Sequence, residues 1–406
     1  MAWRNIWRNP RRTVLTLAAI AFASLLLVFM LSFQFGSYET MINSAVKIHT
    51  GHLKIQAEGY FEKQGIRRVV SKPGRIGEYL SGLPAVDAVS YRANAFSLVS
   101  SRDRTYGALV VGIDPAKEKQ LSTLEALIRQ GEFLSEQDTD AALIGKLLAK
   151  NLHVGLGDEL TVLGQGRDGS VAAAVFTVKG IYSSGQDAFD RSSIQVPLHY
   201  FQEIFAMEDS VHEVVITGHS LGDVSTIARS AEQFLETLSP ENPLVALEWH
   251  ALMPGLLQGI QLDLISGFIF YLVLIMVVAF SILNTFLMAI FERTHEFGVL
   301  MALGTTPGRL RRLVLLESSV LTLVGVMAGI VLGCLVTGYF QVHGIDFEGA
   351  SELLEAYGIS GRMYPRLSIL SALLGPGIVL VITVLTALYP AYRIGKLKPV
   401  EAIARK

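Results

Sequence analysis

Four long apolar runs constrain the fold of this chain more than any other feature of its sequence. Each is long enough to form a helix of about 20 residues, which is the length that crosses the hydrocarbon core of a bilayer. A mean hydropathy of +0.43 agrees with a chain that lies partly in lipid. The predicted spans are residues 13–35, 265–291, 313–340 and 367–389.

Basic residues gather at three flanks of these spans, and the positive-inside rule places all three flanks in the cytoplasm. Both termini are therefore expected to be cytoplasmic. The first span is too long for a cleavable signal and no small-residue cleavage motif follows it, so we expect it to be retained. The basic residues are Arg4, Arg8, Arg11 and Arg12 before the first span, Arg293, Arg309, Arg311 and Arg312 between the second and third, and Arg393, Lys396, Lys398, Arg405 and Lys406 after the fourth.

This topology predicts a membrane protein of four transmembrane α-helices with a large α+β extracytoplasmic domain inserted between helices 1 and 2. The predicted segments are a cytoplasmic amphipathic N-terminal segment (1–12), the first span (13–35), an extracytoplasmic α+β domain of two subdomains (36–264), the second span (265–291), a cytoplasmic loop (292–312), the third span (313–340), a short extracytoplasmic loop (341–366), the fourth span (367–389) and a cytoplasmic tail (390–406).

Charge and metal-ligand content argue against several classes of function. The net charge is only -2, and the arginines at the span ends are already explained by orientation, so no nucleic-acid surface is indicated. The single cysteine, Cys334, excludes an internal disulfide framework and a cysteine-based zinc site. His49 and His52 stand three apart in a strand-like run, which places them on opposite faces. We therefore predict no metal site.

The extracytoplasmic segment shows an α+β pattern. Alternating runs predict strands at 49–56, 86–101 and 105–114 and a hairpin or meander over 158–184, and amphipathic runs predict helices at 72–83, 143–154, 197–207 and 223–238. Residues 164–169 fit the dinucleotide pattern G-x-G-x-x-G, but a strand rather than a helix follows them. We interpret them as a hairpin turn.

The pentapeptide Gly218-His219-Ser220-Leu221-Gly222 matches the G-x-S-x-G motif of serine hydrolases. A hydrolase also needs a doubly wound parallel sheet and a downstream acid and histidine, and no convincing set follows Ser220. Asp223 is a good N-cap for the next helix. We predict a capped turn between a strand and a helix, with Asp223 rather than Ser220 making the important bond, and no catalytic residue.

Small and polar residues mark the third span. Gly325, Gly329 and Gly333 form a G-x-x-x-G-x-x-x-G ladder that allows another helix to approach closely. The pattern leaves two interpretations open, packing among the four helices of one chain and a seam between two chains. Glu317 lies within two turns of Arg311 and Arg312, which favours a paired carboxylate near the membrane interface over a proton relay.

The loop between the second and third spans carries a short helix. Residues 293–303 fit a helix with Phe297, Leu300, Met301 and Leu303 on or near one side. Gly304 ends it, and Thr306 and Pro307 begin the next helix. We expect the apolar face of this free-standing cytoplasmic helix to be left for a partner.

With these residues the chain resembles the FtsX/MacB-like permeases of ABC transporters, and its outer domain is most similar to the lipoprotein-release branch. The resemblance covers nearly the whole chain. Its motifs are WRNIWRNPRRTVLT before the first span, GKLLAKNLHVGLGDELTV and HTGHLKIQAEGYFEKQ in the outer domain, RTHEFGVLMALGTTPGRLRRLVLLES in the cytoplasmic loop, and YPAYRIGKLKPVEAIA at the C-terminus.

The resemblance implies a permease subunit without its own ATPase, since no G-x-x-x-x-G-K-[ST] phosphate loop occurs in the sequence. The implied partners are a cytoplasmic ABC ATPase dimer that holds ATP and Mg, a second permease that is identical or homologous, membrane lipid, and a lipoprotein or periplasmic adaptor. The implied location is the bacterial inner membrane. The ATPase-coupling residues would be Glu296, Phe297, Gly298, Leu300, Met301, Leu303 and Gly304.

Two classes of function remain open at this point. The first is a mechanotransmission-type permease that extracts or expels an amphiphile such as a lipoprotein, a lipid or a hydrophobic drug. The second is a signalling or scaffold permease that activates an extracytoplasmic hydrolase. The large mixed outer domain favours the first, because an activator needs only a small docking surface. The sequence assigns no substrate-binding residue.

Overall fold

The computed structural model describes residues 10–102, 104–238, 243–346 and 362–394. Most of the predicted N-terminal segment 1–12, the outer loop 341–366 and the tail 390–406 therefore lies outside the described residues. The chain divides into two compact units. A helical unit takes Met1–Tyr38, Gly259–Asp346 and Arg362–Lys406, and an outer unit takes Glu39–Gln258 and Phe347–Gly361.

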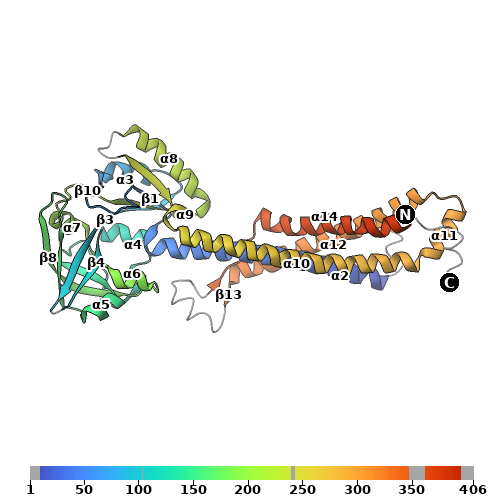
Figure 1. Ribbon diagram of the computed structural model, residues 1–406, viewed down its shortest axis with the longest axis horizontal. Coiled ribbons are helices and arrows are strands. Elements are labelled where there is room, and N and C mark those ends of the chain that lie inside the picture. The colour runs from blue at the N-terminus through green and yellow to red at the C-terminus, as the bar shows by residue number, and fades with distance from the viewer. Residues whose placement is uncertain (1–9, 103, 239–242, 347–361, 395–406) are drawn as a thin grey trace. The chain divides into compact units, whose positions relative to one another are not determined.

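Among the described residues, four helices are long and apolar enough to cross a membrane (Figure 1). They are α2 (Pro10–Ala45), α10 (Pro254–Glu292), α12 (Pro307–His343) and α14 (Ile369–Ile394). Each contains its predicted span, except that α14 begins two residues late. The shorter elements among the described residues of this part are α11 (Thr294–Ala302), β13 (Ile345–Asp346) and β14 (Arg362–Met363).

The glycine ladder of α12 faces α2 of the same chain. A Cβ atom added at Gly325 would lie 2.9 Å from the Cβ of Ile20, and one at Gly329 would lie 2.5 Å from the backbone oxygen of Ala21. A Cβ at Gly333 would lie 2.9 Å from the Cβ of Val28. All three glycines are buried. Of the two interpretations of the ladder, the structure shows packing within one chain.

The outer unit is α+β and contains a ten-stranded mixed sheet. The strands of this sheet are β1 (Leu53–Ala57), β3 (Val86–Ser101), β4 (Arg104–Ile113), β5 (Ile128–Gly131), β6 (Ala141–Gly145), β7 (Glu159–Gln165), β8 (Val171–Tyr182), β9 (Ser193–Pro197), β11 (Glu213–Gly218) and β12 (Leu244–Glu248). β2 (Val70–Ser71) and β10 (Ser210–Val211) pair in a separate two-stranded sheet. The helical elements of the outer unit are η1 (Val46–Thr50), α3 (Pro73–Ser81), α4 (Pro115–Leu121), η2 (Glu125–Leu127), α5 (Lys146–Leu152), α6 (Asp187–Ser192), α7 (Leu198–Ile204), η3 (Leu221–Asp223), α8 (Val224–Thr237) and α9 (Trp249–Leu252).

The long strand β3 joins two hydrophobic cores. Its first half pairs with β11, and this part of the sheet packs against α3 and α8. Its second half pairs with β4 and β7, and the pairs β4–β9, β9–β6, β6–β8 and β8–β7 complete a closed ring of strands. Side chains of α5 and α7 join the core of this ring. The closed ring leaves few unpaired edges, which limits aggregation through strand pairing.

Most predicted elements of the outer unit are present. The run 86–101 coincides with β3. Of residues 164–169, Gly164 and Gln165 end β7 and the rest lie in the turn before β8, which pairs antiparallel with β7 as a hairpin. The helix predicted over 143–154 is α5 alone, because its first three residues belong to the buried strand β6. His49 lies in the π-helical turn η1 rather than in a strand.

The segment around Ser220 is a turn between β11 and α8, as predicted, but the prediction of the important bond is wrong. Asp223 occupies the N-cap position of α8 without a side-chain bond to the helix. The Ser220 hydroxyl instead donates to the Asp223 carboxylate over 2.8 Å. The carboxylate is held by this bond rather than by the backbone amides of α8. The strands next to β11, which are β1 and β3, both run antiparallel to it, unlike the parallel sheet of a hydrolase.

Candidate functional site

The chain turns sharply at both ends of α11. At its first end, only Arg293 separates α11 from α10. At its second end, Gly304 has a positive φ of 93°, its amide donates to the Met301 oxygen, and the Thr305 amide donates to the Leu300 oxygen. This pair of bonds is a Schellman motif. Local sequence therefore fixes where α11 ends.

One face of α11 is buried against the helical unit. Phe297 is 1% exposed and packs with Ile290, Leu310 and Ile394, and Met301 is partly buried against the same cluster. The prediction that Phe297 lies on a face left for a partner is wrong. Residues 297 and 301 are four apart and share a helix face, and that face is taken up by the chain's own core.

A second face of α11 is exposed and apolar. It consists of Val299, Leu300 and Leu303, and the side chain of Leu303, at the C-terminal end of the helix, is 79% exposed. The spacings 299/303 and 300/303 place these side chains next to one another. Of the other residues predicted for coupling, Gly298 is buried, Glu296 is half-buried and Gly304 is exposed. Val299 was not among the residues predicted for coupling.

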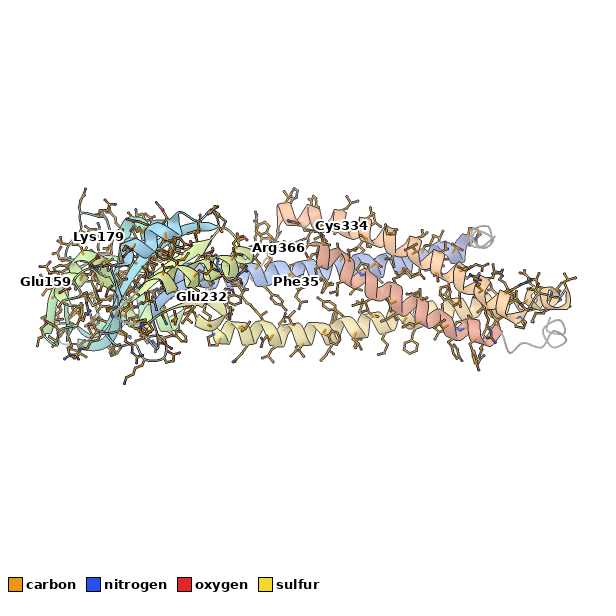
Figure 2. The ribbon with its side chains drawn as sticks, turned by 90° about the horizontal axis from the view of Figure 1, so that it is seen from above. Phe35, Glu159, Lys179, Glu232, Cys334 and Arg366 are labelled. Atoms are coloured by element: carbon orange, nitrogen blue, oxygen red, sulfur yellow. The ribbon has the colours of Figure 1, made fainter. Side chains whose placement is uncertain are left out.

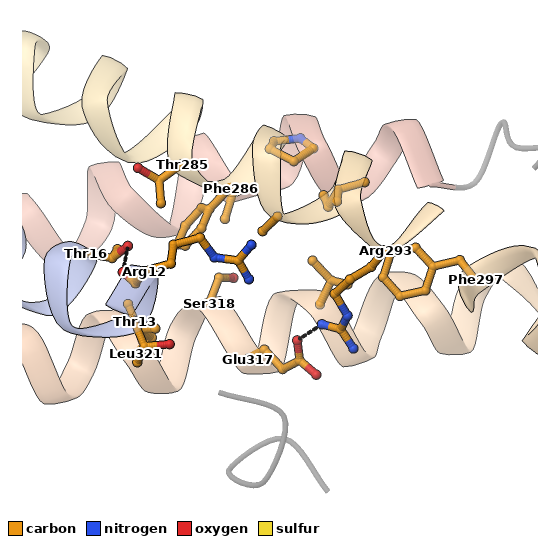
Figure 3. A pocket seen from close by; sticks show the side chains of 15 residues that line it. Arg12, Thr13, Thr16, Thr285, Phe286, Arg293, Phe297, Glu317, Ser318 and Leu321 are labelled. Atoms are coloured by element: carbon orange, nitrogen blue, oxygen red, sulfur yellow. Dashed lines mark hydrogen bonds and ion pairs between the residues drawn. The ribbon is translucent and has the colours of Figure 1, made fainter. Parts of the chain in front are cut away.

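Ion pairs connect the junction between α10 and α11 to the neighbouring helices α2 and α12. Figure 3 shows the Arg293 side chain directed toward Glu317 of α12, with 2.8 Å between Nη1 and Oε2. Arg12 of α2 pairs with Glu292, the last residue of α10. Both arginines line a small cavity of about 70 Å³. Glu317 is a paired carboxylate, as predicted, but its partner is Arg293 rather than Arg311 or Arg312.

A much larger hollow lies between α2, α10 and α14. It has a volume of about 770 Å³, within the range of about 300–1,000 Å³ that is typical of ligand sites. Figure 2 labels Phe35, one of the aromatic residues that line it. We call it the apolar groove. Its lining residues are Leu27, Leu31, Gln34, Phe35, Leu264, Phe268, Tyr271, Leu272, Ile275, Met276, Ala279, Leu374, Gly375, Ile378 and Ile382.

A polar cluster adjoins the apolar groove. Tyr271 donates to the Gln34 side-chain oxygen over 2.8 Å, the Gln34 amide donates to Tyr38 over 2.7 Å, and Tyr38 donates to Asp263 over 2.5 Å. Gln34 and Tyr271 also line the groove. The groove therefore combines apolar walls with hydrogen-bonding groups in one region. The groove was not predicted, because apart from Gln34 and Tyr271 its wall residues are ordinary apolar residues of membrane helices.

The outer unit also exposes an apolar surface. Phe96 and Leu98 of β3 are exposed, and Leu98 is opposite Leu163 of β7 in the strand register. Val171 and Val175 of β8 are exposed as well. An antiparallel sheet normally turns polar residues toward water on its outer face. Apolar residues gathered on such a face are typical of an interaction surface.

Four helices that are long and apolar enough to span a membrane, an α+β unit inserted after the first and a short capped helix after the second define a multi-pass membrane protein. Two family models match the chain, the MacB-like periplasmic core domain over residues 13–234 and the FtsX-like permease C-terminal domain over residues 268–399. The chain belongs to the FtsX/MacB-like permeases of ABC transporters, and its outer unit is their periplasmic domain.

Curated relatives agree with this assignment. The chain is 23% identical to the lipoprotein-releasing system transmembrane protein LolC of Xylella fastidiosa, over 74% of each chain. It is 23% identical to the LolE protein of Haemophilus influenzae, over 79% of this chain and 78% of the other. It is 22% identical to the ABC transporter permease MJ1507 of Methanocaldococcus jannaschii, over 99% of this chain and 96% of the other.

Proposed function

We propose that this chain is the permease subunit of an ATP-driven, mechanotransmission-type transporter that extracts or expels an amphiphilic cargo such as a lipoprotein or a lipid. The apolar groove is the observation that carries this proposal. Its walls match the chemistry of an acyl chain, and the adjoining Gln34, Tyr38 and Asp263 supply hydrogen-bonding groups for a polar head. The names of the LolC and LolE relatives support cargo of this class.

The groove is poorly suited to a hydrophilic cargo. Burying a polar group without a hydrogen-bond partner costs roughly 2–7 kcal/mol. Apart from Gln34 and Tyr271, the groove offers only apolar or backbone surface. A cargo that places its apolar part in the groove and keeps its polar part near this cluster avoids that cost.

The partners follow from the same proposal. A cytoplasmic ABC ATPase dimer, with ATP and Mg bound to it, would contact the exposed face of α11 formed by Val299, Leu300 and Leu303. A second permease would complete the transporter in membrane lipid. A lipoprotein or a periplasmic adaptor would use the exposed apolar surface of β3, β7 and β8. We propose a bacterial inner-membrane location with cytoplasmic N- and C-termini, which the basic residues at the span ends support.

Filling the apolar groove tests the proposed cargo. Ile378 of α14 lines the groove, whereas Val381 on the same helix lies outside it with an exposed side chain. In proteoliposomes that contain the full complex, Ile378→Trp should weaken binding of a fluorescent triacylated lipopeptide by about tenfold, which corresponds to 1.4 kcal/mol. Val381→Trp, the matched control, should bind as wild type.

The outcomes separate the two classes of function. Equal binding by Ile378→Trp and wild type would contradict a cargo site in the groove. A wild-type complex that hydrolyses ATP but neither binds nor releases the lipopeptide would favour the signalling permease.

A further inference from the structure

Arg293 occupies the junction between a long membrane helix and the short helix that follows it. Glu292 is the last residue of α10 and Thr294 is the first of α11. Arg293 has φ -98° and ψ 7°, outside the α-helical region. The chain therefore changes direction at this residue. Its backbone oxygen accepts from the Phe297 amide over 3.0 Å, so Arg293 also begins the hydrogen bonding of α11.

The side chain of Arg293 contacts two helices at once. Its Nη1 atom lies 2.8 Å from Oε2 of Glu317 in α12, and its Nε atom lies 3.5 Å from Oε2 of Glu296 in α11. Its guanidinium carbon lies 5.2 Å from the centre of the Phe297 ring. The planar guanidinium suits such multiple contacts, which a lysine ammonium does not reproduce. One cation therefore joins α11 to α12.

This ion pair is more shielded than its neighbour. The side chains of Arg293 and Glu317 are 18% and 13% exposed, whereas those of Arg12 and Glu292 are 28% and 42% exposed. Shielding from water strengthens the attraction between opposite charges and reduces its screening by salt. The pair between Arg293 and Glu317 is therefore the stronger mechanical connection of the two, and Glu292 offers a matched control.

We infer that Arg293 is a positioning residue that transmits movement of α11 to α12 through Glu317. The inference rests on the proposed function, in which an ATPase contacts the exposed face of α11. Arg293 holds the first end of α11 to α12 through Glu317, and the turn at Gly304 joins its second end to α12. The short helix therefore moves with α12 as one body. Since α12 packs on α2 through its glycine ladder, displacement of α11 shifts a contact between two membrane spans.

The test uses the full permease and ATPase complex in proteoliposomes. Glu317→Gln keeps the shape of the side chain but removes its charge, and Glu292→Gln makes the same change in the more exposed pair. Glu317→Gln should retain ATP hydrolysis, while release of the triacylated lipopeptide per ATP falls by about fivefold to tenfold, as expected when an equilibrium loses roughly 1–1.4 kcal/mol of bias. Glu292→Gln should couple nearly as wild type, and Glu317→Asp, which keeps the charge, should retain most of the coupling.

A distance measurement tests the inference without reference to cargo. Spin labels at Ala302→Cys in α11 and Leu323→Cys in α12, in a Cys334→Ser background, report the separation of the two helices. Both label sites are exposed. The distance should be the same with and without ATP in otherwise wild-type protein, and Glu317→Gln should broaden the distribution or make it depend on nucleotide.

The results distinguish failure of the inference from failure of the proposed function. If Leu300→Asp combined with Leu303→Asp leaves stimulated ATP hydrolysis intact, α11 is not the ATPase contact and the role of Arg293 falls with it, whereas the proposed cargo site is still decided by lipopeptide binding to Ile378→Trp. If that double variant loses stimulation but Glu317→Gln matches wild type in release per ATP and in the distance distribution, only the role of Arg293 is overturned.

Discussion

Replacing Gly329 by alanine tests the packing of α12 on α2. An added Cβ atom would lie 2.5 Å from the backbone oxygen of Ala21 and 2.5 Å from the Cβ of Ser24. Neither atom can rotate away, because one belongs to the backbone and the other is fixed to it. Carbon contacts are most favourable at about 3.5–4.0 Å, so the two helices would have to separate by about 1 Å at this point.

The magnitude follows from two opposing effects. Alanine is favoured over glycine in a helix by roughly 0.5–1 kcal/mol, whereas forcing extra volume into a packed contact costs about 1–3 kcal/mol. Gly329→Ala should therefore destabilise the protein by about 1–2 kcal/mol. Gly338 lies on the same helix with no atom within 4 Å of its added Cβ. Gly338→Ala should stabilise the protein by about 0.5–1 kcal/mol.

The assay is denaturant titration of the full chain in detergent micelles at two protein concentrations. We expect the two variants to differ by about 1.5–3 kcal/mol in the free energy of unfolding, independent of protein concentration. Leucine at Gly329 should exceed the effect of alanine. Equal effects at Gly329 and Gly338 would refute the argument from close contact. A loss at Gly329 that diminishes as protein concentration rises would instead indicate a seam between two chains.

Two further predictions concern the outer unit. Ser220→Ala and Asp223→Ala each remove the same hydrogen bond, so each should lower the free energy of unfolding by about 0.5–1.5 kcal/mol. Lipopeptide transport should stay intact, and a serine-directed phosphonate should not label the protein. Labelling of Ser220 would contradict the turn assignment. Burial lowers the pKa of His212 from 6.5 to about 4 by disfavouring its charged form, so its stabilising effect is complete above pH 6.5 and is lost as pH falls toward 4. The contribution of His212 to the free energy of unfolding should decrease by about 2 kcal/mol between pH 7.5 and pH 5. Thermal melts of His212→Gln should lack this part of the pH dependence. Equal acid sensitivity in wild type and variant would refute the prediction.

The parts of the fold that sequence predicted well are those encoded by local periodicity. The membrane spans follow from apolar length, and β3 follows from sixteen residues of strand-like pattern with turns at both ends. The turn after α11 was predictable because Gly304 and Pro307 each have a strong positional preference. These signals need no knowledge of what the element packs against.

The predictions that were wrong concern which neighbouring residue a side chain contacts. α11 has nine residues, and its apolar side chains occur on more than one face, so its sequence does not indicate that Phe297 turns inward and Leu303 outward. Glu317 was assigned to Arg311 and Arg312 because they lie within two turns on its own helix, and sequence distance was the only measure of proximity. Its partner Arg293 is twenty-four residues away and was brought close by the turn.

The apolar groove also could not be predicted from local sequence patterns. Its walls come from three helices that are far apart in the sequence. An apolar lining residue such as Ile378 is indistinguishable by pattern from an exposed residue outside the groove, such as Val381. Only the packing of the helices determines which apolar residues enclose a cavity.

The backbone of the turn between α11 and α12 is conformationally restricted. Gly304 is held in the left-handed region by a bond to Met301, and the Thr305 amide is bonded to Leu300. Thr306 is extended at φ -71° and ψ 145°, as a residue before proline must be. A helix bounded by such a turn does not reorient by loop fluctuation on the nanosecond scale. Movements of α11 are therefore collective motions shared with the long helices, and such motions take microseconds to milliseconds. The rate at which α11 can move is set by the packing of the four long helices.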